Sequence, residues 1–168
     1  MYLFDKKFKK NFHFYIMQSI LATLSLVVIF YLLNTFTHTA VVASLGATTF
    51  IIFAMPNYPP AQPRKVIGGH LIGIIVGIFC LYLSSLNLIT ETSFISKDMI
   101  EVIIPALSVG LSIFIMVITN TEHPPAAGTA LGITVQGWNY SAVLIILITV
   151  ITLSIIKYLL KSWLRDLV

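Results

Sequence analysis

The chain reads Thr119-Asn-Thr-Glu-His-Pro-Pro-Ala-Ala-Gly-Thr-Ala-Leu131 between two segments that are apolar enough to dissolve in lipid. Glu122 is the only charged residue of this run, and two adjacent prolines follow it, which cannot continue a helix from upstream. Small residues come next. A simple connection between two helices does not need such a sequence, so we interpret the stretch as the best candidate for a functional site.

Composition predicts a polytopic membrane protein. Of 168 residues, 58% are hydrophobic and 10% are charged, against about 25% charged residues in soluble domains. We expect one transmembrane domain over residues 1–168, with a basic N-terminus (1–13), a helical bundle (14–160) and a basic tail (161–168). The net charge of +4 comes from residues at the ends of hydrophobic runs, which favours anchoring in the lipid bilayer over binding of nucleic acid. The lone Cys80 excludes an internal disulfide and suits helix packing.

The spacing of charges predicts the helices, because about 20 residues are needed to cross the hydrocarbon of a bilayer. The fold class is therefore all-α, a bundle of about five spanning helices with a short broken or half-helix after the His-Pro-Pro motif, at about Ala126–Val135. We place Pro105 in the first turn of the fourth span, where its missing N–H costs little. The second span is short and should pack inside the bundle. The five expected spans are about 14–33, 40–55, 66–86, 103–118 and 141–160.

Charge also predicts orientation. The lysine-rich N-terminus, Arg64-Lys65 and the basic C-terminus are expected on the cytoplasmic side, and the acidic loop Asn87–Glu101 on the other side. This requires an even number of crossings, so Glu122–Gly137 must itself carry the chain across. In the alternative, that stretch enters and returns, and the C-terminus lies outside.

The sequence contains a weak internal repeat. Ser44-Leu-Gly46 followed by Tyr58-Pro-Pro-Ala61 resembles Ser108-Val-Gly110 followed by His123-Pro-Pro-Ala126. Weak repeats of this kind are typical of transporters whose site lies between broken helices of two halves. A chance match in an apolar sequence of low complexity explains the repeat equally well.

Helix starts are the first candidate for a binding surface. After the double proline, the N–H groups of Ala127, Gly128 and Thr129 are expected to be free donors at the positive end of a new helix, which attracts anions. The start of the Val66 helix is the expected second half of this surface, where the guanidinium of Arg64 adds several N–H donors. Two helix starts would then face one small anion.

The side chains of the same stretch allow two interpretations. Asn120, Thr121 and Thr129 can donate to a ligand, but local capping of the backbone is favoured for each. His70 and His123 can carry a proton with the anion, whereas a structural histidine bonded to a carbonyl is equally good for His70. Glu122 would pair with Arg64, orient His123 or take up a proton.

Enzymatic and metal functions have little support in the sequence. The four histidines show no His-x-x-x-His spacing, there is no Cys-x-x-Cys pair, and the Gly-x-Ser-x-Gly and phosphate-loop signatures are absent. We therefore predict no enzyme, no metal and no cofactor.

Three motifs in order carry a resemblance to a known family. They are Ala43-Ser-Leu-Gly-Ala47, Ala61-Gln-Pro-Arg64 with Gly69-His70-Leu71, and the His-Pro-Pro run quoted at the start. Together they resemble the HPP family of integral membrane proteins over most of the chain. The resemblance implies a small multi-span protein, and it implies nitrite as the leading substrate, because some members of the family have been linked to nitrite transport.

These arguments predict a transporter or channel for a small monovalent inorganic anion, nitrite first, in the bacterial inner membrane with its N-terminus in the cytoplasm. The alternative is a non-transporting membrane sensor or scaffold. The small-residue face of Gly69, Gly73 and Gly77 serves packing within the chain or a homo-oligomer, and the sequence does not separate these. The expected substrate-binding residues are Arg64, His70, Asn120, Thr121, Glu122, His123, Pro124, Pro125, Ala127, Gly128 and Thr129.

Overall fold

A computed structural model describes residues 8–33, 39–86 and 96–168. Residues 34–38 of the expected polar turn and 87–95 of the expected hydrophilic loop lie outside these residues, and Thr39 begins a helix. The described part contains helices and a single 3₁₀ turn, η1 (Pro59–Ala61), and no strand. The expected all-α fold is therefore confirmed. The helices are α1 (Phe8–Leu33), α2 (Thr39–Ala54), α3 (Pro63–Ser84), α5 (Lys97–Ile118), α6 (Pro124–Gln136) and α7 (Tyr140–Leu160).

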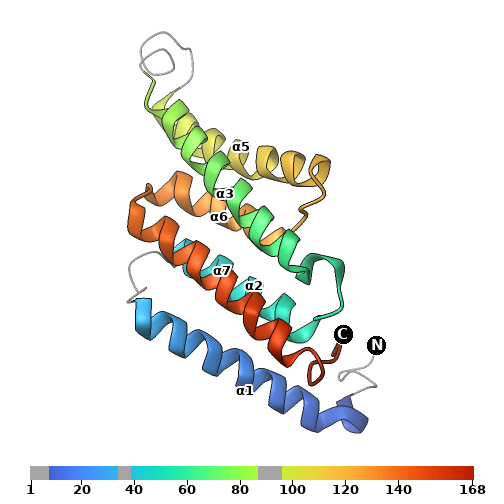
Figure 1. The fold of residues 1–168 in the computed structure, drawn as a ribbon. Helices are drawn as coiled ribbons and strands as arrows, with labels where there is room; N and C mark the ends of the chain where they lie inside the picture. The colour runs from blue at the N-terminus through green and yellow to red at the C-terminus, as the bar shows by residue number, and fades with distance from the viewer. Residues whose placement is uncertain (1–7, 34–38, 87–95) are drawn as a thin grey trace.

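The six helices run alternately between two ends of the bundle (Figure 1). We call one end the proline end: it holds residues 54–65 and 119–123. The other, the loop end, holds the end of α3, the start of α5 and the connection from α6 to α7. The start of α1 and the C-terminus lie toward the proline end: Tyr15 in α1 donates from its hydroxyl to Leu167 O at 2.6 Å, and Gln18 accepts from the N–H of Arg165 at 3.0 Å. The described helices thus traverse the bundle an even number of times, which is the arrangement that the predicted even number of membrane crossings requires.

Among the helices of the described residues, four are long and apolar enough to cross a membrane: α1, α3, α5 and α7. The other two are shorter, with 16 residues in α2 and 13 in α6, or about 24 Å and 20 Å of helix at 1.5 Å per residue. Both lie inside the bundle, where α6 contacts α2, α3 and α5 (Figure 1). The predictions of a short internal second helix and of a half-helix after the double proline are confirmed.

Some helix boundaries differ from the prediction. Helix α1 begins at Phe8 rather than near residue 14, so part of the basic N-terminal segment is helical. Helix α5 begins at Lys97, not near residue 103, because Ser96 caps it by accepting from the N–H of Met99 at 3.3 Å. Pro105 consequently lies in the helix interior, not in the first turn. Its ring removes the hydrogen bond that the carbonyl of Glu101 would otherwise accept.

The glycine face of α3 packs within the chain. A Cβ placed on Gly69 would lie 2.8 Å from His123 Cβ, and one on Gly77 would lie 2.9 Å from Ala130 O. Gly73, between them, lies so close to the carbonyl of Ala126 that no side chain fits. The order of these contacts shows that α3 and α6 run in parallel, with α6 starting at the level of Gly69. The small-residue face therefore serves packing between helices.

Candidate functional site

The polar run begins with a helix cap. Asn120 has a φ of 54°, the left-handed conformation that ends many helices. The N–H of Thr121 donates to Met116 O at 2.9 Å and that of Asn120 to Val117 O at 3.2 Å, which together form a Schellman motif at the end of α5. The hydroxyls of Thr119 and Thr121 lie 2.8 Å apart. The backbone N–H groups of Asn120 and Thr121 thus cap the end of α5, whereas the favoured alternative was capping by their side chains.

The observed start of α6 contradicts the prediction of which backbone N–H groups are free. The helix begins at Pro124, one residue after its N-cap His123. The N–H groups without helical partners are those of the cap and the first three helical residues, but Pro124 and Pro125 have none, and Ala126 donates to His123 O at 2.9 Å. Ala127, Gly128 and Thr129 lie inside the helix, so the prediction that their N–H groups are free is wrong. The error arose because the sequence prediction placed these three residues in the first turn of the helix.

The two helix starts also lie at different depths. Helix α6 begins beside Gly69, which is six residues into α3, or about 9 Å along the helix axis. Arg64, in the first turn of α3, is exposed. The two starts therefore do not face one another, and Arg64 is not part of a shared site with Pro124 and Pro125.

The structure instead brings together five side chains, which we call the histidine cluster: Ser44 and Thr48 of α2, His70 of α3, and His123 and Thr129 of the α6 segment. Four are fully buried, and Ser44 is 5% exposed. His70 lies seven residues into α3, about 10 Å from the proline end. The parallel packing of α3 and α6 places both imidazoles in the interior, with ring centroids 5.2 Å apart.

Hydrogen bonds connect the cluster into one chain. Ser44 Oγ donates to the carbonyl of Pro125 at 2.6 Å and lies 2.9 Å from Thr129 Oγ1, which lies 2.8 Å from His70 Nδ1. The other nitrogen of His70, Nε2, lies 2.8 Å from Thr48 Oγ1.

Thr48 then links the first imidazole to the second. Its Oγ1 lies 3.0 Å from His123 Nε2, and His123 Nδ1 donates to the carbonyl of Pro60 at 2.8 Å. The chain of contacts therefore runs from one proline motif to the other through both histidines.

Glu122 has a different partner from the expected ones. Its Oε2 lies 2.6 Å from Lys65 Nζ, so Glu122 pairs with Lys65 and not with Arg64. This hydrogen bond lowers the pKa of the Glu122 carboxyl below its ordinary value. The stabilisation by the pair is therefore present above the ordinary pKa of a glutamate and is lost as the pH falls through the lowered value. The pair lies at the proline end, where it joins α3 to the connection before α6.

Sequence reasoning missed two of the five cluster residues. Ser44 and Thr48 belong to a segment that we interpreted only as small residues for helix packing. Their spacing of four residues places both hydroxyls on one face of α2, and polar residues on one face of an apolar helix are the signal that predicts an interior polar site. Among the residues expected at the site, the structure unites His70, His123, Pro125 and Thr129.

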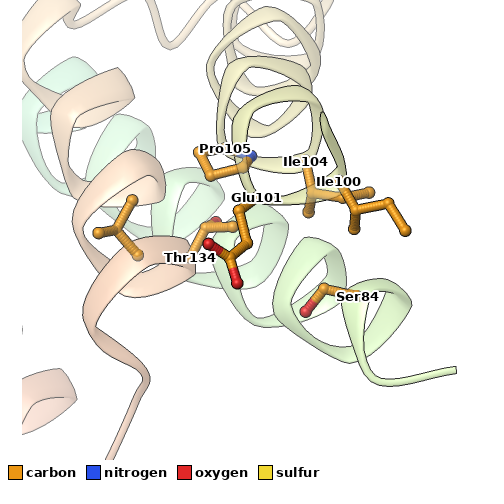
Figure 2. A pocket seen from close by; sticks show the side chains of 7 residues that line it. Ser84, Ile100, Glu101, Ile104, Pro105 and Thr134 are labelled. Atoms are coloured by element: carbon orange, nitrogen blue, oxygen red, sulfur yellow. The ribbon is translucent and has the colours of Figure 1, made fainter. Parts of the chain in front are cut away.

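Four cavities of the described bundle lie away from this cluster. One, of about 530 Å³, is lined by Glu101, Pro105 and Thr134 near the loop end, where α3, α5 and α6 meet (Figure 2). Three others are lined by residues 75–85 with Trp138, by 12–21 of α1, and by α1 with Phe50, Phe53, Ala54 and the C-terminus. None of these four reaches the histidine cluster. Within the described ranges, no three ligating side chains gather where a metal ion would fit.

Comparison with known proteins gives the family. A profile described as "HPP, transmembrane region" matches residues 7–166. Two transmembrane proteins of Dictyostelium discoideum are 38% and 36% identical over 90 and 89 residues, or 54% and 52% of this chain. These matches span only 28% and 25% of the relatives' own lengths, and the relatives' names state no activity. No solved structure matches. Because the family profile covers nearly the whole chain, the protein belongs to the HPP family of integral membrane proteins.

Proposed function

We propose that this protein is a membrane transporter or channel for a small monovalent anion, with nitrite as the leading substrate, and that the histidine cluster is its binding site. One observation carries the proposal: five buried polar side chains meet between two proline-started helices inside a bundle of apolar helices. Polar and ionisable groups are expensive within a membrane and mark substrate pathways. Broken helices at a repeat interface are a common setting for such sites.

The donors available to an anion are side chains. In the first turn of α6, Pro124 and Pro125 have no N–H and that of Ala126 is occupied. An anion would therefore displace contacts within the cluster, with Thr48 and Thr129 as hydroxyl donors and an imidazolium supplying N–H and positive charge. The positive end of the α6 dipole lies beside His123 and adds a favourable field for a negative ligand. A monovalent anion with few atoms suits a cluster with so little space.

Entry requires another conformation of the bundle. Both imidazoles are fully buried, so an anion must be admitted by movement of the surrounding helices. The Lys65–Glu122 pair at the proline end joins α3 to the chain just before His123, and opening there would expose the cluster. Rocking of one repeat against another is the usual way in which transporters expose a central site.

The closed interior favours a second candidate. A cluster sealed on both sides also suits a non-transporting membrane module that senses a ligand or supports a partner protein. Because the predicted orientation places the proline end in the cytoplasm, such a module would present its termini to cytoplasmic partners. Flux through the purified protein separates the two candidates.

The test is anion flux in liposomes. Purified protein should accelerate nitrite entry, and His70→Gln and His123→Gln should each reduce the rate at least about tenfold, the effect of losing roughly 1.4 kcal/mol of interaction. His13→Gln is the matched control, because His13 is exposed on α1 and its loss should leave flux unchanged. A folded wild-type protein that moves neither nitrite nor any other small anion would overturn the proposal in favour of the second candidate.

A further inference from the structure

The ends of the hydrogen-bonded chain determine how many hydrogens it needs. At one end Ser44 Oγ contacts the carbonyl of Pro125, and at the other His123 Nδ1 contacts the carbonyl of Pro60. Carbonyl oxygens only accept hydrogen bonds. Both terminal links therefore require a hydrogen from inside the chain, so Ser44 and His123 Nδ1 must both donate outward.

The cluster has fewer hydrogens than contacts. Six close contacts connect Pro125 O to Pro60 O through the five side chains. Three hydroxyls and two neutral imidazoles bring one hydrogen each, which makes five. Thr48 has a further acceptor, the carbonyl of Ser44 at 3.1 Å, which competes for its single hydrogen. With both rings neutral, one contact therefore lacks a hydrogen.

The shortage falls between the two rings. Because Ser44 donates to Pro125, Thr129 must donate to Ser44, and His70 Nδ1 must donate to Thr129. Each ring then has its hydrogen on Nδ1, and both Nε2 atoms face the one hydroxyl of Thr48, at 2.8 Å and 3.0 Å. Thr48 can satisfy only one of them. A second imidazole hydrogen on either Nε2 completes the chain.

We propose that the histidine cluster is a binding site for one proton, shared between Nε2 of His70 and Nε2 of His123 through the hydroxyl of Thr48. The site takes one proton and not two, because two fully buried imidazolium rings with centroids 5.2 Å apart would repel each other. This goes beyond the proposed anion transport and does not depend on it.

The geometry also allows the proton to move between the rings. When His123 is the imidazolium, its Nε2–H bond breaks as the proton passes to Thr48 Oγ1. The O–H bond of Thr48 breaks in the same step, and that proton forms a new bond to His70 Nε2. The positive charge passes from one ring to the other, and no other reactant is needed.

The surroundings of the cluster add few other charges. Neither α2 nor α6 has an ionisable residue, and α5 has its own near the loop end, Asp98 and Glu101 among them. On α7, Lys157 Nζ donates to Ala61 O at 2.7 Å. Glu122 precedes His123 in the chain, and its negative charge is neutralised by the positive charge of Lys65. The two rings are thus the acceptors for the added proton inside the bundle.

The test counts protons on the two rings. Protein with ¹⁵N-labelled histidine and the changes His13→Gln and His38→Gln, which leave His70 and His123 as the only histidines, is titrated in lipid nanodiscs and followed by NMR. We expect both rings to respond in a single step with a total uptake of one proton, and both Nδ1 atoms to bear hydrogen throughout. No uptake over the pH range in which the protein stays folded, or uptake of two protons, would overturn the proposal.

Two variants test the role of Thr48. Thr48→Val keeps the shape but removes the hydroxyl, and it should abolish the joint response. Thr48→Ser keeps the hydroxyl and should retain it. A joint response that persists in Thr48→Val refutes sharing through this hydroxyl. The wild-type proton count decides the proposal even if Thr48→Val does not fold. Because the titration needs no flux, its result is independent of the transport assay.

Discussion

Individual residues show where close packing fixes the site. The backbone of α6 lies against the glycines of α3, and this approach places His123 beside Gly69 and brings Thr129 within 2.8 Å of His70 Nδ1. A side chain on the α3 surface would separate the two helices. The hydrogen-bonded chain across the cluster would then be broken, since each of its contacts is shorter than about 3.2 Å, the normal limit for such bonds.

Gly73→Ala should therefore destabilise the protein. Its new methyl group would overlap the carbonyl of Ala126, and overpacking of this kind costs about 1–3 kcal/mol. Thermal or denaturant unfolding in detergent would measure the loss. Gly110→Ala is the matched control, because nothing lies within 4 Å of the added Cβ there. Equal effects of the two substitutions would contradict the packing argument.

Helices and connections show what the sequence could predict and what it could not. Long apolar intervals predicted α3 and α7 to within a few residues, and the double proline predicted a new helix start. The cap at Ser96 starts α5 about six residues before the predicted position, which hydropathy alone could not locate. The left-handed Asn120 follows the end of α5 at Ile118, where the polar run predicted that end. The pairing of Thr48 with both histidines arises from three helices distant in sequence, and no local pattern encodes it.

Pro105→Ala tests the interior position of that proline in α5. The substitution restores an N–H that can donate to the carbonyl of Glu101, so we expect an increase in stability of up to about 3 kcal/mol, the cost of a proline in a helix interior. Pro63→Ala is the comparison, because Pro63 is in the first turn of α3, where the N–H has no helical acceptor. Unfolding in detergent should separate the two variants. An unchanged or lower stability of Pro105→Ala would contradict the expected gain from the restored hydrogen bond.

The whole described molecule is a bundle in which the start of α1 and the C-terminus lie at one end. Helix α6 makes the sixth pass although it is only 13 residues long, because its start is recessed beside Gly69 and the extended connection covers the remaining depth. Both proline motifs lie at this same end. The two similar segments, 44–61 and 108–126, therefore run in the same direction, like repeats related by an axis along the membrane normal.

Labelling of single cysteines tests this topology. In a Cys80→Ser background, a cysteine added to either terminus should react with a membrane-impermeant reagent from the same side of the membrane. Gln136→Cys, at the exposed end of α6, should react from the opposite side. We expect the termini on the cytoplasmic side, because most of the basic residues lie toward the proline end. Termini that react from opposite sides would refute the even number of passes.

The shared position of the start of α1 and the C-terminus also has a consequence for larger proteins built on this bundle. A soluble domain joined at either end would enter the same compartment, and domains joined at both ends would be held near each other. Two such domains would have a high effective concentration without any contact of their own. With an even number of passes, the bundle can thus hold two attached modules close together on one face of the membrane.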